Sequence, residues 1–149
     1  MKPLIVLIST FVIALVVTYF IQHNANILLS GRIGMSVMLL FTAIGHFKFT
    51  NGMAMMLPSS IPAKKQIVIA TGFIEILAAI GLLVSPIIKP AGILLILFFV
   101  LILPANIYAA SKNVNLEKAN YTGKGINYLW FRIPEQLLFI SWVYWFAVK

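Results

Sequence analysis

Two carboxylates inside long apolar segments, Glu75 and Glu135, are the residues best placed to do chemistry away from water. A charged side chain at the centre of a bilayer costs about 2.5–3.5 kcal/mol, so it tends to face other helices and find a partner. Glu75 lies in "ATGFIEILAAIGLL", where Thr71, Gly72 and Ala79 share its helical face and let a neighbouring helix approach closely. A carboxyl group in that setting is either a structural partner for a basic residue or a group that exchanges protons.

Two basic side chains could serve that carboxylate. His46 carries an imidazole, whose ordinary pKa of about 6.5 suits proton exchange with Glu75, although a lone histidine near a helix end also serves as an interfacial anchor. Arg132 has Glu135 at i+3 and Gln136 at i+4 on its own face, so it either pairs within its helix or reaches Glu75 across helices. The sequence leaves both alternatives open.

The stretch "LILPANIYAA" combines Pro104, Asn106 and Tyr108 at the end of an aliphatic run. Proline has no N–H, so Pro104 deprives the carbonyl of Val100 of its helical partner and predicts a bend or a loosened turn. Asn106 can donate and accept between helices, and Tyr108 offers a hydroxyl one turn beyond the proline. Such a break is tolerated in a membrane only where protein or a polar cavity covers it.

These residues need elements to position them, and hydropathy and length place helices at about 4–21, 28–49, 67–85, 91–109 and 129–147. A run of about 20 apolar residues crosses a hydrocarbon core of roughly 30 Å. The runs lack the alternation of a membrane barrel. We therefore expect an all-α, polytopic bundle of five transmembrane helices.

Composition supports one integral membrane domain over residues 1–149. Of the 149 residues, 62% are hydrophobic and 9% charged, against about 25% charged in a typical soluble domain. The chain contains no cysteine, which excludes disulfides and thiolate-bound metals, and its two histidines indicate no metal site. The net charge of +8 follows the membrane loops and does not indicate a nucleic-acid partner.

Lysine and arginine counts predict the orientation. With five spans, the N-terminus and the loops near 50–66 and 110–128 share one side, which carries Lys2, Lys48, Lys64, Lys65, Lys112, Lys118 and Lys124. The other side has only Lys89, Lys149 and Arg32. We expect the side chain of Arg32, near a helix end, to reach the outer headgroups. We expect a multi-pass protein of the cell membrane (inner or plasma membrane), and the positive-inside rule places its N-terminus in the cytoplasm and its C-terminus outside. The loop near 50–66 is expected to lie in the inner interface.

The same topology gathers the polar side chains in the cytoplasmic half. Glu75 is roughly 12 Å from the inner end of its helix, at about 1.5 Å per residue. The expected polar pocket consists of His46, Glu75, Asn106, Tyr108, Arg132 and Gln136, beside the break at Pro104.

The order "GHF…MLPSSIP…TGFIEILAAIGLL…KPAG…LPANIYAA…FRIPEQ" resembles the DoxX-like family of small membrane proteins, in the branch with a P-A-N-x-Y signature. The resemblance covers roughly residues 31–145. It implies a four-helix core to which the first helix is an N-terminal addition. It also implies a link to quinol oxidation or to oxidative-stress complexes. Glu135 departs from the family pattern, which more often has an apolar residue there.

Three functions are expected from these patterns. The first is an accessory subunit of membrane redox chemistry, with a quinone or a partner oxidoreductase. The second is binding or transport of a small lipophilic or weakly acidic molecule, and the third is a structural accessory of a membrane complex. No nucleophile–base pair, metal constellation or cofactor motif is visible, so an autonomous enzyme is not expected. Membrane lipids are expected partners, and a homo-oligomer is left open.

Overall fold

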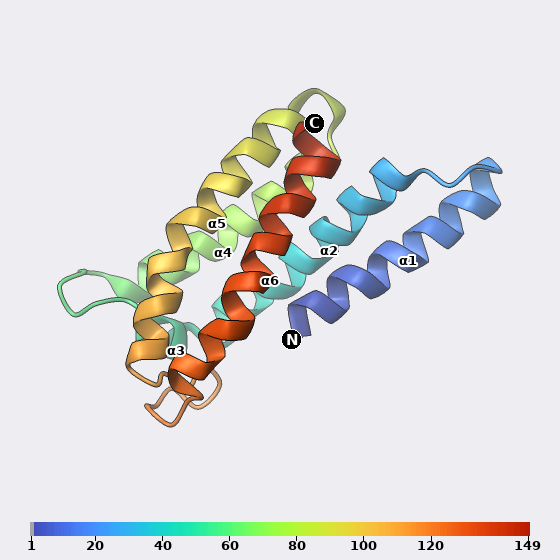
Figure 1. Ribbon diagram of the computed structural model, residues 1–149. Coiled ribbons are helices and arrows are strands. Elements are labelled where there is room, and N and C mark those ends of the chain that lie inside the picture. Colours follow the sequence, from blue (N-terminus) through green and yellow to red (C-terminus); the bar gives the residue numbers. More distant parts are fainter. Residues whose placement is uncertain (1) are drawn as a thin grey trace.

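A computed structural model describes residues 2–149 as a bundle of helices (Figure 1). Five long helices are joined by short loops, by the five-residue helix α3 and by two 3₁₀ turns, and the chain ends in a π-helical turn. Their bounds are α1 Lys2–Gln22, α2 Ile27–Lys48, α3 Thr50–Ala54, α4 Lys64–Gly81, η1 Ser85–Ile87, α5 Ile88–Ser111, η2 Gly125–Tyr128, α6 Leu129–Val143 and η3 Tyr144–Val148. No strand forms between residues 2 and 149, which confirms the all-α prediction.

α5 begins earlier than hydropathy predicts, and α4 ends earlier than hydropathy predicts. α4 stops at Gly81, and residues 85–87 form a 3₁₀ turn that leads directly into α5. The reason is local: Ser85 and Pro86 open the turn, and proline is accommodated at the first positions of a helix, where its missing N–H costs nothing. Residues 50–54, predicted as part of an interfacial loop, form the short helix α3.

Between residues 2 and 149, three helices are long and apolar enough to cross a membrane, which indicates an integral membrane protein. They comprise residues Lys2–Ile21, Ile27–Lys48 and Ser85–Ser111. α4 has 18 residues and carries Lys64, Lys65 and Glu75, and α6 has 15 residues before its π-helical extension. The prediction of five crossings is therefore supported by composition and length for three of the five helices.

α2 lies between α1 and α4, and these three helices form one half of the bundle (Figure 1). Gly34 of α2 faces α1 so closely that a Cβ there would lie 3.2 Å from the carbonyl oxygen of Leu7. On its other side, Ser36 Oγ donates to the carbonyl of Ala79 in α4 at 2.9 Å. α5 and α6 complete the bundle, with Phe99 and Phe139 in the shared core.

The C-terminal turn closes the end of the bundle opposite α3. Arg32 Nε donates to the carbonyl of Phe146 at 2.8 Å, and Trp142 Nε1 donates to the carbonyl of Gly31 at 2.9 Å. A side chain at Gly31 would collide with the Phe146 ring, whose nearest atom is 2.3 Å from the Cβ position. Arg32 is thus half-buried and bonded to the C-terminal turn, and its predicted reach to the outer headgroups stays a prediction.

The opposite end of the bundle is formed by α3 and residues 112–124. Within this segment Asn115 pairs with Asn120 in an isolated bridge, and Leu116 lies against Gly52 of α3. Lys2 Nζ contacts Glu117 Oε1 at 2.6 Å, which brings the start of α1 to the same end. The predicted grouping of the N-terminus with the 110–128 loop agrees with this contact.

Candidate functional site

His46 and Glu75 are brought together by the crossing of α2 and α4. His46 Nε2 lies 3.4 Å from Glu75 Oε1, and the two side chains are 16% and 6% exposed. The close approach depends on Gly72, one turn before Glu75, because a Cβ there would lie 2.9 Å from His46 Cβ. The small-residue face predicted around Glu75 therefore does bring a neighbouring helix close.

The other ring nitrogen of His46 determines the protonation pattern of the pair. His46 Nδ1 lies 3.0 Å from the carbonyl oxygen of Val68 and 3.0 Å from Thr71 Oγ1. Thr71 uses its own hydroxyl hydrogen to bond the Val68 carbonyl at 2.8 Å. A carbonyl oxygen only accepts, so the proton of the neutral imidazole belongs on Nδ1. Nε2 is then the basic nitrogen, and it faces the carboxyl group.

One further proton is needed between Nε2 and Oε1, since neither atom could otherwise donate. If it resides on Glu75, both side chains are neutral, and if it resides on His46, they form an ion pair; the net charge is zero in both cases. The second oxygen, Oε2 of Glu75, is buried and has no hydrogen-bond partner among the described residues. Buried polar atoms are normally satisfied, so this carboxyl oxygen is a candidate contact for a water, an ion or a ligand.

A second polar group lies between α5 and α6. Asn106 Nδ2 donates to Gln136 Oε1 at 3.1 Å, and Gln136 Nε2 donates to the carbonyl of Phe99. Both side chains are buried. The Phe99 carbonyl adjoins that of Val100, which lost its helical donor to Pro104, so the amide bonds the backbone at the weakened turn.

Arg132 bonds within its own helix. Arg132 Nη1 donates to Glu135 Oε2 at 2.9 Å, with the arginine 26% exposed and the glutamate 1% exposed. Of the two pairings that the sequence left open for Arg132, the structure has the one with Glu135.

Pro104, the predicted helix break, and Tyr108 lie outside these buried polar groups. Pro104 lies inside α5 without ending it, and it is exposed on the surface of that helix. Tyr108 is half-buried one turn further on. An apolar hollow of about 110 Å³ lies on the α5–α6 side, lined by Phe99, Val100, Leu103, Ile133, Gln136, Leu137 and Ile140.

Five of the six predicted pocket residues thus lie in three separate groups: His46 with Glu75, Asn106 with Gln136, and Arg132 with Glu135, which was not one of the six. Tyr108 belongs to none of these groups. A single shared pocket stays a prediction. Sequence reasoning missed the carbonyls of Val68 and Phe99, which are invisible in side-chain patterns. It noted Thr71 only as a small residue beside Glu75.

Comparison with known proteins places most of the chain in one family. Residues 35–147 match the family described as "Domain of unknown function (DUF8561)", and the match omits α1 and the first turns of α2. No curated protein and no solved structure matches the chain. The resemblance to the DoxX-like family stays a prediction, because the matched family carries a different description.

Proposed function

The chain belongs to this family of unknown function, and we propose from its own residues that it is an accessory protein of quinone-linked redox chemistry in the membrane. The observation that carries the proposal is the buried pair of His46 and Glu75, whose Nε2 and Oε1 lie 3.4 Å apart. In this role the five long helices all cross the membrane, with the N-terminus in the cytoplasm. The DoxX-like order of motifs supports the same assignment.

The proposed contribution of this chain is proton exchange. Oxidation of a quinol to a quinone releases two electrons and two protons. The electrons pass to a partner oxidoreductase, one proton is taken up by the His46–Glu75 pair, and the other proton is released to water. Taking up or releasing a proton changes the charge of the neutral pair by one unit, and the unsatisfied Oε2 of Glu75 offers a further acceptor.

A second role is favoured for the α5–α6 group. Asn106 donates to Gln136, and Gln136 donates to the Phe99 carbonyl. This arrangement resembles structural hydrogen bonding between helices more than a ligand site. We assign these residues to holding α5 against α6. The structural-accessory function predicted from the sequence fits this group of residues.

The test is to purify the protein in native-lipid nanodiscs and to measure co-purifying quinones and other small molecules by mass spectrometry. Wild type is compared with Glu75→Gln and with Ser36→Ala, a matched control that removes another α2–α4 hydrogen bond but no ionisable group. A quinone enriched over bulk lipid, lost in Glu75→Gln and retained in Ser36→Ala, supports the proposal. A different small molecule with the same dependence supports the binding or transport function instead. Bulk lipid alone in wild type contradicts both.

A further inference from the structure

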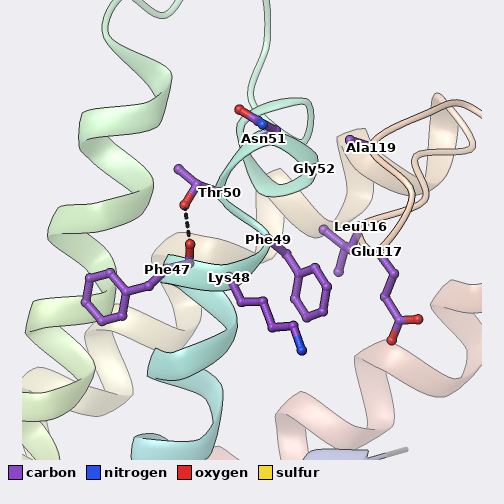
Figure 2. Close-up of a pocket in the computed structure, with 9 residues that line it drawn as sticks. All are labelled: Phe47, Lys48, Phe49, Thr50, Asn51, Gly52, Leu116, Glu117 and Ala119. Carbon is purple, nitrogen blue, oxygen red and sulfur yellow. Dashed lines mark hydrogen bonds between the residues drawn. The ribbon is translucent and has the colours of Figure 1, made fainter.

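A hollow of about 260 Å³ lies at the end of the bundle where α2 meets α3 and the 112–124 segment (Figure 2). It is separate from the His46–Glu75 pair, and none of the functions predicted from the sequence uses it. Its lining residues are Phe47, Lys48, Phe49, Thr50, Asn51, Gly52, Leu116, Glu117 and Ala119.

The hollow owes its shape to a close backbone contact. Gly52 of α3 is buried against residue 116, and a Cβ at this glycine would lie 2.0 Å from the carbonyl oxygen of Leu116. Thr50 Oγ1 donates to the carbonyls of His46 and Phe47, at 2.7 and 3.0 Å, and so fixes the turn between α2 and α3. The two walls of the hollow, from α2–α3 and from the 112–124 segment, are therefore held in fixed positions.

The charge at the hollow is positive. Lys2 bonds Glu117, and this hydrogen bond and charge hold the pKa of the Glu117 carboxyl below its usual range; the charge of Lys48 acts in the same direction. Two ammonium groups and one carboxylate leave one net positive charge. Lys48 extends beside the Phe49 ring, with its Nζ 5.6 Å from the ring centre, and Figure 2 shows the ring between the side chains of Lys48 and Glu117.

The position of the hollow points to a membrane ligand. Lys48 is the last residue of a helix long and apolar enough to span a bilayer, so it lies where the hydrocarbon core gives way to phosphates. Phe49 and Leu116 supply apolar surface beside the charge. At about 260 Å³ the hollow is smaller than the roughly 300–1,000 Å³ of most small-molecule pockets, which suits a headgroup whose acyl chains remain in the bilayer.

We propose that this hollow binds the phosphodiester headgroup of one phospholipid, with Lys48 as its cation. One net positive charge neutralises the single negative charge of the phosphodiester. The bound lipid would connect the end of α2 to the 112–124 segment. This inference does not depend on the role proposed for His46 and Glu75.

Native mass spectrometry of the full chain in detergent tests the proposal. The protein is delipidated and titrated with phosphatidylglycerol, and the affinity for the first bound lipid is measured for wild type, Lys48→Gln and Lys112→Gln. Lys112 is an exposed lysine at the same end of the bundle that does not line the hollow. We expect Lys48→Gln to weaken the first binding event about fivefold, as the loss of one basic residue at a membrane surface does, and Lys112→Gln to leave it unchanged. Equal weakening in both variants would overturn the proposal, because it would indicate general surface charge.

Two further measurements separate the site from its alternatives. Gly52→Ala should also weaken the first binding event, because its Cβ displaces the Leu116 backbone, whereas Gly45→Ala, with only Met53 Cε at 3.6 Å, should not. Retention of first-lipid affinity in Gly52→Ala would contradict the site. Inorganic phosphate is then added as a competitor. If it displaces the bound lipid at the concentration at which phosphatidylglycerol itself binds, the hollow is reassigned to free phosphate.

Discussion

His46 Nε2 faces Glu75 Oε1 at 3.4 Å while His46 Nδ1 faces the carbonyl oxygen of Val68 at 3.0 Å. The imidazole of α2 is therefore held at both ring nitrogens by α4. The Val68 carbonyl fixes the tautomer, and the tautomer directs the basic nitrogen to the carboxyl group. The packing of α2 on α4 and the orientation of the imidazole depend on the same few atoms.

Removal of His46 should cost more stability than neutralisation of Glu75. His46→Ala leaves the buried carboxyl of Glu75 without its imidazole, and we expect the free energy of unfolding to fall by about 3 kcal/mol. Glu75→Gln should lower it by about 1 kcal/mol or less, because the glutamine amide can donate to Nε2. Unfolding in mixed micelles with increasing dodecyl sulfate measures both. The double variant should lose less than the sum of the two losses; simple additivity would mean that the pair is not coupled.

Gly72 should control the geometry of the pair. Gly72→Ala places a Cβ 2.9 Å from His46 Cβ, and because that atom is attached directly to the backbone, the helices must separate. We expect a loss of about 1–3 kcal/mol in the free energy of unfolding, as for overpacked cores. Gly45→Ala is the matched control on α2, since its Cβ makes only an ordinary contact. An unchanged stability in Gly72→Ala would show that the α2–α4 crossing tolerates the larger side chain.

The α5–α6 hydrogen bonds should contribute unequally. Gln136→Leu removes the bond from Asn106 and the bond to Phe99, whereas Asn106→Leu removes only the first. With interhelical hydrogen bonds worth about 0.6–2 kcal/mol in membrane proteins, we expect the glutamine variant to be the more destabilised in the same micellar unfolding experiment. The reverse order would mean that the bond to the Phe99 carbonyl contributes nothing.

The Lys2–Glu117 contact should depend on pH. The pKa of Glu117 is lowered from 4.5 by the hydrogen bond and charge of Lys2, so the contact stabilises the fold above that value and is lost as the pH falls through the lower pKa of the folded state. A carbon-13 NMR titration of the Glu117 carboxyl in micelles should give a midpoint below 4.5, and Lys2→Gln should raise it. A midpoint that Lys2→Gln leaves in place would contradict the contact.

Cysteine labelling can test the five crossings, because the natural chain has no cysteine. Single cysteines at Ser59 and Lys118 should react with a membrane-impermeant maleimide from the cytoplasmic side. A single cysteine at Lys149 should react from the outside. Ser85, after α4, should react from the outside. Labelling of positions 59 and 85 from the same side would show that α4 does not cross, and cytoplasmic labelling of position 149 would overturn the proposed orientation.

The positions of the helices could be predicted from the sequence. The expected segments 4–21, 28–49 and 91–109 correspond to α1 at 2–22, α2 at 27–48 and α5 at 88–111. Hydropathy, length and proline are local properties, and a membrane leaves the backbone no alternative to the helix in such runs. The end of α4 and the helix at 50–54 were missed. The turn around Pro86 has a local signal, a proline at the start of a helical turn, which hydropathy alone does not show. The short helix depends on the contact of Gly52 with residue 116.

The sequence by itself thus determined the helical class, the apolar spans and the set of polar residues placed among them, because each is set by the residue types along one segment. Only the tertiary structure decided which of these residues meet. It paired Glu75 with His46 and Arg132 with Glu135, and it joined Asn106 to Gln136. The physical reason is that such partners depend on the rotation of each helix about its axis and on how closely two helices approach. Those quantities are set by contacts between distant segments, such as Gly72 against His46.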